Sequence, residues 1–119
     1  DDAILIKDNH LKLSSSIAEA VRKSKEIHPN LTVEVEVDTI VQALEVTKSK
    51  ADRVMLDNFS PKEVAEAVSK IRQISDIEIE VSGGINSTNI ASYAPYADFI
   101  SMSSLTMSAP PVDFSLHVI

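Results

Sequence analysis

Short β-type runs alternate with helical patterns along the chain, and this alternation limits the possible folds more than any other feature. A regular succession of strand, helix and strand favours right-handed βαβ units and an all-parallel sheet. The sequence therefore predicts an α/β fold, built either as a segment of a barrel or as a doubly wound open sheet. The predicted strands are Ala3–Lys7, Thr32–Val37, Arg53–Leu56, Ile77–Val81 and Asp98–Met102.

Three of the intervening segments begin with helix-start signals. Ser16 with Glu19 and Thr39 with Gln42 have the spacing of a capping box, and Ser60-Pro61-Lys62-Glu63 combines an N-cap, a first-turn proline and an acidic third position. Apolar residues at helical spacing follow each start, and a shorter helix is expected after Asn86. The three stripes are Ile17, Ala20, Val21, Ser24 and Ile27; Ile40, Ala43, Leu44 and Thr47; and Val64, Ala67, Val68 and Ile71.

The spacing of the predicted strands favours a barrel. Strands begin roughly every twenty to thirty residues, as in (β/α) barrels that use about 250 residues for eight units. The 119 residues hold five such units. A barrel segment alone would expose two sheet edges, so this interpretation requires that the residues belong to a longer chain.

Two of the predicted strands alternate strictly between apolar and acidic residues, Val33 to Val37 and Ile77 to Val81. Such alternation places two carboxylates on one face of each strand. In an antiparallel sheet this face would be the one exposed to solvent. Because helices separate the strands here, we expect the apolar side chains to face outer helices. The glutamates would then point into a barrel interior, where they need cations, donors or water.

Composition excludes several classes of function. A formal net charge of -7 opposes non-specific binding to nucleic acid or anionic membranes. Without cysteine, the chain cannot form disulfides, thiolate nucleophiles or Cys-ligated zinc sites. No basic region followed by a hydrophobic stretch opens the sequence. We therefore expect one globular unit over residues 1–119, a cytoplasmic location, and small molecules or proteins as partners.

Polar residues follow every predicted strand, at the sheet edge where parallel α/β folds bind ligands. Lys7 is the clearest cation among them and suits a carboxylate or phosphate oxygen, although a surface lysine is the alternative. Glu36 and Asp57 could hold ribose hydroxyls or Mg²⁺, and for Asp57 a turn-forming role is equally open. The residues concerned are Lys7-Asp8-Asn9-His10, Glu36 with Asp38, Asp57-Asn58, Ser82-Gly83-Gly84 and Ser101 to Ser104.

The glycines give the sharpest local signal. The chain has only two, adjacent at Gly83 and Gly84 and preceded by Ser82. Glycine lets backbone N–H groups approach a phosphate closely and permits positive φ, and a helix following the turn would add its dipole. A plain tight turn is the alternative, but it does not explain why glycine is absent elsewhere, including helix ends.

Six short motifs in order resemble the quinolinate phosphoribosyltransferases, also called nicotinate-nucleotide pyrophosphorylases. Each motif is weak alone, but together they extend from Lys7 to Leu116 and cover nearly the whole chain. The motifs are Lys-Asp-Asn-His, Val-Glu-Val-Glu-Val, Leu-Asp-Asn-Phe, Ser-Gly-Gly-Ile, Ile-Ser-Met-Ser-Ser-Leu-Thr and Asp-Phe-Ser-Leu.

The resemblance implies an enzyme of NAD biosynthesis. Its reaction would be the Mg²⁺-dependent conversion of quinolinate and phosphoribosyl pyrophosphate to nicotinate mononucleotide, pyrophosphate and carbon dioxide. The fold implied is an incompletely closed barrel of about seven strands, of which these five would be the later ones. By motif position, Lys7 would contact anionic oxygens of the substrate, Glu36 and Asp57 the ribose hydroxyls and metal environment, and Ser82, Gly83 and Gly84 the 5′-phosphate.

The chain departs from the family pattern in two respects. Ser103 stands where the family usually has a phosphate-contacting glycine. The basic segments that grip quinolinate and the N-terminal sandwich domain precede the position of Lys7 in the family. We therefore expect the 119 residues alone to release no carbon dioxide from quinolinate. The resemblance also implies a homodimer, or a higher homo-oligomer, that shares arginines between subunits.

Three other interpretations remain open from sequence. A nicotinate phosphoribosyltransferase, or a barrel relative linked to molybdenum transport, would share these motifs. A receiver domain of a response regulator would match the length and the aspartate ending the third strand, Asp57, but it would need an acidic pair after the first strand and a lysine after the fifth. A non-catalytic half-barrel that self-associates to cover its edges is the third.

Overall fold

A computed structural model describes residues 3–7 and 16–102, which form five strands, four α-helices and one short 3₁₀-helix. The predicted bounds of β1 and β2 are confirmed. β3 continues one residue further than predicted, β4 is displaced by one residue, and β5 is shortened to two residues. The elements are β1 Ala3–Lys7, α2 Ile17–Ile27, β2 Thr32–Val37, α3 Ile40–Thr47, β3 Arg53–Asp57, α4 Pro61–Arg72, β4 Glu78–Ser82, α5 Ile90–Tyr93, η1 Ala94–Tyr96 and β5 Phe99–Ile100.

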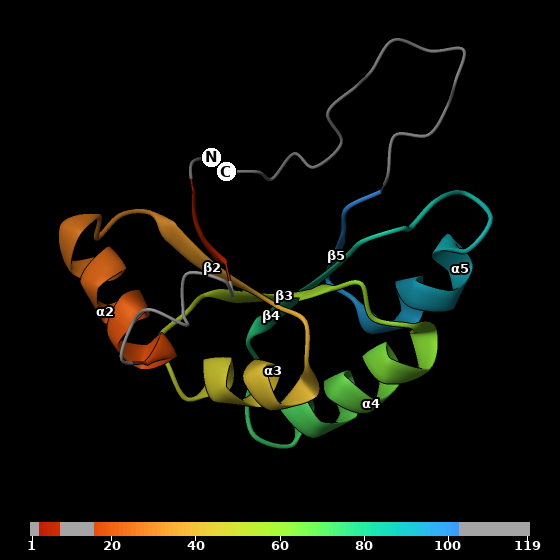
Figure 1. Ribbon diagram of the computed structural model, residues 1–119, viewed down its shortest axis with the longest axis horizontal. Coiled ribbons are helices and arrows are strands. Elements are labelled where there is room, and N and C mark those ends of the chain that lie inside the picture. Colours follow the sequence, from red (N-terminus) through yellow and green to blue (C-terminus); the bar gives the residue numbers. More distant parts are fainter. Residues whose placement is uncertain (1–2, 8–15, 103–119) are drawn as a thin grey trace, which may run out of the picture.

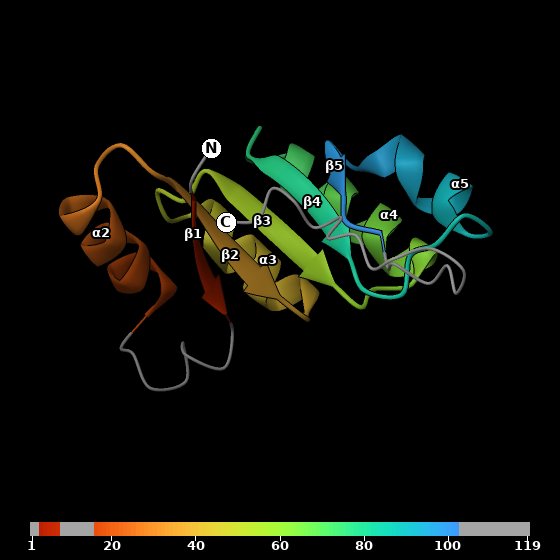
Figure 2. The same ribbon diagram turned by 90° about the horizontal axis from the view of Figure 1, so that it is seen from above.

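The strands form one parallel sheet in which spatial order follows sequence order, β1-β2-β3-β4-β5. Figure 2 shows the strands side by side. All four α-helices lie on one side of the sheet, which bends so that its other side is concave (Figure 1). A doubly wound sheet reverses its strand order and carries helices on both faces. The receiver-domain interpretation is therefore wrong, and the architecture is that of successive βα units wound in one direction.

Local sequence explains where the long helices begin. The Ser16 hydroxyl accepts the Glu19 N–H at the start of α2, and complete capping boxes open α3 at Thr39 and α4 at Ser60. These bonds satisfy N–H groups that have no partner within a helix. In the part of the chain that the structure describes, no helix is both long enough and apolar enough to cross a membrane.

The hydrophobic core lies between the helices and the convex face of the sheet. The predicted stripe of α4 is confirmed by the burial of Val64, Ala67 and Ile71. In α3 the buried positions are Ala43 and Val46, so the predicted stripe missed Val46. Ile27, the last residue of α2, is 70% exposed, so its predicted place in the buried stripe is wrong.

The two faces of the sheet differ in chemistry, as the alternation of acidic and apolar residues predicts. Val33, Val35 and Val37 have no exposed surface and belong to the core beneath the helices. Residues at the intervening positions occupy the concave face. Among them Glu34 and Glu80 are fully buried. The glutamates therefore face the interior of a curved sheet, and not open solvent.

A repeated aspartate clamp fastens the amino ends of the strands. Asp52 precedes β3, and its carboxylate accepts the Val33 N–H of β2 at 2.8 Å and the ammonium of Lys25 at 2.9 Å. Asp98 precedes β5 and repeats this arrangement with Ile79 at 2.9 Å and Arg72 at 3.0 Å. Each aspartate also donates its own N–H to the same partner residue.

We expect Asp52→Ala and Asp98→Ala each to lower the free energy of unfolding by about 1–2 kcal/mol, measured by urea denaturation. Most of that loss comes from a strand N–H left without its acceptor, because partly exposed ion pairs contribute at most ~1 kcal/mol. Asp76→Ala, at an exposed position, is the control and should be nearly neutral. Equal effects for all three variants would contradict the clamp.

Candidate functional site

The carboxyl ends of the strands carry most of the residues that the sequence singles out. One row of register partners crosses the concave face, running Lys7, Glu36, Met55, Glu80 and Phe99. Asp57 and Ser82 are partners two residues further toward the carboxyl end, on the same face. Lys7, Glu36, Asp57 and Ser82 therefore share one face and one end of the sheet.

Interactions on this face run diagonally to the register. Three pairs link residues two strands apart, and in each the later residue lies two positions beyond the register partner. Two residues over two strands amount to a stagger of one residue per strand, which is the stagger of an eight-stranded barrel with a shear of 8. The pairs are Glu34 with Glu80, Arg53 with Phe99, and Lys7 with Asp57.

The stagger sorts the concave face into layers contributed by alternate strands, as in (β/α) barrels. Glu34 and Glu80 form a layer from the even strands, and the same stagger predicts that Glu36 and Ser82 form the next layer above them. Lys7 and Asp57 form a layer from the odd strands at the carboxyl end. The stagger thus sets Lys7 across from Asp57, and the register places Glu36 and Ser82 at the same carboxyl end of the concave face, which we call the mouth.

Asp57 is a carboxyl group at this mouth whose pKa is perturbed. Partial burial and the negative charge of Asp38 raise its pKa, while the positive charge of Lys7 opposes the rise. The carboxylate is thus held where a cation or a hydroxyl donor would stabilise it. Asp38, which directly follows β2, is an acidic neighbour that the resemblance did not single out.

The glycine pair forms a turn that needs glycine for two different reasons. Gly83 has φ 94°, and a Cβ built on it would lie 2.7 Å from the backbone nitrogen of Asn58, so both conformation and space exclude a side chain. Gly84 has φ 69° but nothing within 4 Å of a built Cβ, so that side of the turn is open. Asn89 donates its side-chain N–H to the Gly84 carbonyl at 2.9 Å and fixes the turn from behind.

The expected helix dipole does not lie next to this turn. α5 has four residues, begins at Ile90 and lacks a side-chain cap. Asn86 and Asn89 instead bridge the loop between the turn and the helix, where the Asn89 side chain accepts the Asn86 N–H at 2.8 Å. Any anion held here would therefore depend on the turn and not on a helix terminus.

A buried polar network lies beneath the mouth. Ser101 donates its hydroxyl to the carboxylate of Glu80, and the guanidinium of Arg53 lies 3.8 Å from Glu80 and 3.1 Å from Glu78. As a carboxylate, Glu34 has no donor for either oxygen. Burial, a hydrogen bond with Glu80 and the charge of Glu80 raise the pKa of Glu34 to about 9, so it holds a proton at neutral pH.

Sequence reasoning found the glutamates of this network but missed two of their partners. Arg53 is the first residue of β3, a position where a charged residue is not unusual in sequence. In the structure its guanidinium carbon lies 3.9 Å from the centroid of the Phe99 ring. Ser101 was grouped with polar residues at the mouth, whereas it is buried against Glu80. The only sequence signal for either contact is the alternation of apolar and acidic residues in β4, because β5 is too short to show a pattern of its own.

The carboxylates at the mouth suit a magnesium ion that arrives with its ligand. Within residues 3–7 and 16–102, no three histidine, cysteine, aspartate or glutamate side chains are arranged around a common metal position. Mg²⁺ commonly uses one or two protein carboxylates and completes its shell with water and substrate phosphates. Glu36 and Asp57 fit that mode of binding, and they do not amount to a complete protein cage.

Several predicted residues lie outside the described part of the chain. These are Asp8, Asn9 and His10 after β1, and Ser103 and Ser104 after β5. The predictions for Ser103 and for the Asp-Phe-Ser-Leu motif at 113–116 are therefore not tested by the structure.

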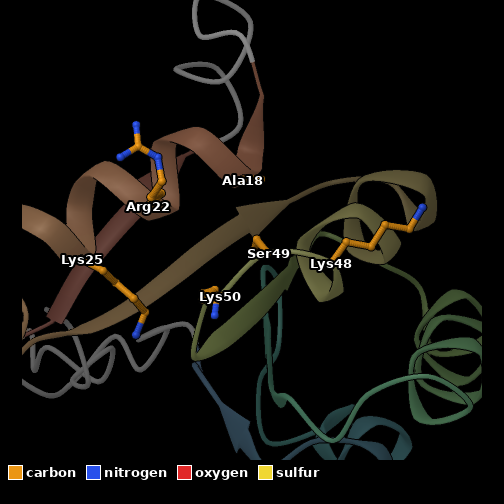
Figure 3. A pocket seen from close by; sticks show the side chains of 6 residues that line it. All are labelled: Ala18, Arg22, Lys25, Lys48, Ser49 and Lys50. Atoms are coloured by element: carbon orange, nitrogen blue, oxygen red, sulfur yellow. The ribbon is translucent and has the colours of Figure 1, made fainter.

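A second concavity, of about 300 Å³, lies on the helical side of the molecule, away from the mouth. Its walls come from α2 and from the end of α3 with the loop that follows. The charged ends of its arginine and lysine side chains point away from one another and do not converge on a common point (Figure 3). This arrangement does not form a focused anion site. The lining residues are Ala18, Arg22, Lys25, Lys48, Ser49 and Lys50.

Comparison with known proteins places these features in a family. The model of the quinolinate phosphoribosyl transferase C-terminal domain matches residues 1–117. The chain is 42% identical to a probable nicotinate-nucleotide pyrophosphorylase (carboxylating) of Methanocaldococcus jannaschii, over 100% of this chain and 44% of the relative. It is 36% identical to the human nicotinate-nucleotide pyrophosphorylase (carboxylating), over 97% of this chain and 40% of the relative.

A solved structure agrees with this match. The nicotinate-nucleotide pyrophosphorylase from Francisella tularensis superimposes with a TM-score of 0.79 and 41% identity, over 94% of this chain and 40% of that one. The chain thus spans less than half the length of the relatives it matches.

Proposed function

Since the chain belongs to the quinolinate phosphoribosyltransferase family, we propose that it takes part in transfer of the phosphoribosyl group from phosphoribosyl pyrophosphate to quinolinate, with decarboxylation to nicotinate mononucleotide. The observation that carries this proposal is the convergence of Lys7, Asp57 and the glycine turn on one mouth of a curved parallel sheet. A phosphoribosyl ligand has hydroxyl groups and a phosphate at opposite ends, and these polar groups match them in kind.

We propose further that residues 1–119 form the C-terminal part of an incompletely closed barrel of about seven strands. The stagger of one residue per strand supports a barrel, because a flat sheet would pair Glu34 with Glu78 instead of Glu80. Within residues 3–7 and 16–102, β1 and β5 each pair on one side only. Further strands, or a second subunit in a homodimer or higher homo-oligomer, would cover those edges.

Each residue at the mouth has a distinct proposed task. Asp57 and Glu36 accept hydrogen bonds from ribose hydroxyls and stabilise positive charge that develops at the anomeric carbon. Lys7 contacts an anionic oxygen and balances Asp57. Ser82, Gly83 and Gly84 hold the 5′-phosphate through the backbone of their turn. Ser103 is proposed to extend that phosphate contact, on the ground of its position in the Ile-Ser-Met-Ser motif alone.

Glu36 and Asp57 are the residues that would hold Mg²⁺, directly or through the substrate. When bound with phosphoribosyl pyrophosphate, the ion would neutralise charge on the leaving pyrophosphate. The contribution of the protein is to keep two carboxylates close to the ribose in a partly buried place, where their field is stronger than in water. The cytoplasmic location stays a prediction.

The test is a titration of the isotope-labelled chain with phosphoribosyl pyrophosphate and MgCl₂, followed by NMR. We expect saturable shifts of the Gly83 and Gly84 amides and of the Asp57 carboxyl. Asp57→Asn keeps the shape but removes the charge, and should weaken binding about tenfold, since hydrogen bonds to charged groups contribute roughly 1.5–3 kcal/mol. Chelating Mg²⁺ with EDTA should weaken binding as well.

Two controls make this result specific. Inorganic phosphate should shift the glycine amides alone, and Glu66→Gln on the exposed face of α4 should bind as the unaltered chain does. Shifts confined to Lys48 and Lys50 would move the site to the outer concavity and refute the proposal.

A further inference from the structure

Asn58 has an unusual backbone conformation at the edge of the proposed site. Among the described residues it is the one non-glycine with positive φ, at 63°. Asparagine tolerates this left-handed region better than most residues, but it is still uncommon there. Asn58 directly follows Asp57 at the end of β3. A strained residue next to a proposed catalytic carboxyl calls for a physical explanation.

The backbone of Asn58 is locked against the end of β4. Its N–H donates to the carbonyl of Ser82 at 2.9 Å. A Cβ on Gly83 would meet the nitrogen of Asn58 at 2.7 Å, its Cα at 3.0 Å and its side-chain Oδ1 at 3.0 Å. The nearest contact between the two segments is therefore backbone to backbone. Since glycine puts no side chain into this contact, the position of Asn58 determines that of the glycine turn and the reverse.

The residues on either side of Asn58 are also held. Asp57 is the register partner of Ser82. Phe59 is 5% exposed, and its carbonyl accepts the hydroxyl of Tyr93 at 3.0 Å in the buried space beside α5. Ser60 then caps α4. The chain must pass from a strand to a helix cap within two residues, so the left-handed conformation is imposed by its surroundings.

We propose that Asn58 is a positioning residue whose left-handed backbone fixes the distance between the Asp57 carboxyl and the Ser82-Gly83-Gly84 turn. This inference rests on the proposed function, because that distance matters only if one ligand bridges both groups. Asparagine suits this position for two reasons. Glycine would adopt the same conformation but would make the unfolded chain more flexible, which lowers stability, and alanine disfavours the left-handed conformation.

The first test needs no ligand. Hydrogen exchange of the residue 58 amide reports its bond to Ser82. Asn58→Ala should exchange at least about tenfold faster than the unaltered chain and should shift the amides of Gly83 and Gly84, because alanine disfavours positive φ. Asn58→Gly should retain most of the protection. Asn30→Ala and Asn30→Gly, at an exposed turn asparagine without positive φ, are the matched controls and should leave the turn unchanged.

The second test measures affinity for phosphoribosyl pyrophosphate with MgCl₂. Asn58→Ala should bind roughly 10- to 100-fold more weakly, as expected for a displacement of about 1 Å in a site with two fixed ends. Asn58→Gly should recover most of that affinity. Inorganic phosphate, which reaches the turn alone, should be affected much less.

The outcomes separate this inference from the proposed function. If Asn58→Gly binds as poorly as Asn58→Ala, the side chain itself contacts the ligand and the positioning role is overturned. Unchanged exchange and unchanged glycine shifts in Asn58→Ala would also overturn it. If the unaltered chain binds no phosphoribosyl pyrophosphate, the proposed function fails, and hydrogen exchange still decides whether Asn58 fixes the turn.

Discussion

Glu34→Gln is expected to raise the free energy of unfolding at pH 8 by on the order of 2 kcal/mol. Glu34 has no exposed surface, and as a carboxylate it would face Glu80 without a donor of its own. The glutamine amide supplies a permanent N–H where the glutamate must keep a proton. The substitution therefore preserves the shape and the hydrogen bond while removing the cost of that proton.

The same substitution should change how stability depends on pH. Burial, then the hydrogen bond and charge of Glu80, raise the pKa of Glu34 from 4.5 to about 9. Between these values the unfolded chain has released a proton that the folded chain still holds, so stability falls as pH rises. For one proton the slope is at most about 1.4 kcal/mol per pH unit. Below pH 4.5 the Glu34 carboxyl is protonated in both states, and its contribution to stability is fully present.

Urea denaturation between pH 5 and pH 9 measures both effects. The charged groups that act on Glu34 remain in place in the variant, namely Glu36 of the same strand, Arg53 of β3 and Glu80 of β4. Glu66→Gln, half exposed on α4, is the control for losing a surface glutamate and should keep the slope of the unaltered chain. A Glu34→Gln variant with an unchanged slope would show that Glu34 does not hold the proton.

Gly83→Ala is the second large effect, with an expected loss of about 3 kcal/mol in the free energy of unfolding. Alanine at this position would need φ 94° and would place its methyl group 2.7 Å from the nitrogen of Asn58. Because the contact is with backbone, no side chain can rotate away to relieve it. The ends of β3 and β4 must separate, and phosphate binding at the turn should be lost together with stability.

Gly84→Ala provides the comparison, because this glycine also has positive φ but no neighbour within 4 Å of a built Cβ. We expect a loss of only about 1 kcal/mol, the conformational cost alone. Thermal unfolding and phosphate titration of both variants measure the difference. Equal losses would mean that conformation, and not the approach of Asn58, explains why glycine occupies position 83.

Much of the fold follows from local patterns in the sequence. The capping signals at Ser16, Thr39 and Ser60 predict three helix starts that the structure confirms. The alternating valines and glutamates of β2 predict which face is buried beneath helices. Errors occur where an element is short or ends. β5 has two residues, too few for a period to be visible, and Ile27 is exposed at the last position of α2.

The site divides in the same way. The motifs identify Lys7, Glu36, Asp57 and the glycine turn as candidate site residues, but no single motif predicts how these residues are arranged relative to one another. The partnership of Glu34 with Glu80, the contact of Arg53 with Phe99 and the left-handed backbone of Asn58 were not predicted. The first two join residues that are distant in sequence, and the third depends on the distant contacts of Asn58 with Ser82 and Gly83.

The sequence by itself determined the order of strands and helices, the helix caps, the polar strand ends and the family. These features depend on spacings of two to four residues, which are the same whatever the tertiary structure around them. Only the tertiary structure decided that the strands lie in sequential order and that a stagger of one residue per strand brings polar residues from different strands to one mouth. Those outcomes depend on twist, packing and burial between distant segments, and local spacing contains no record of them.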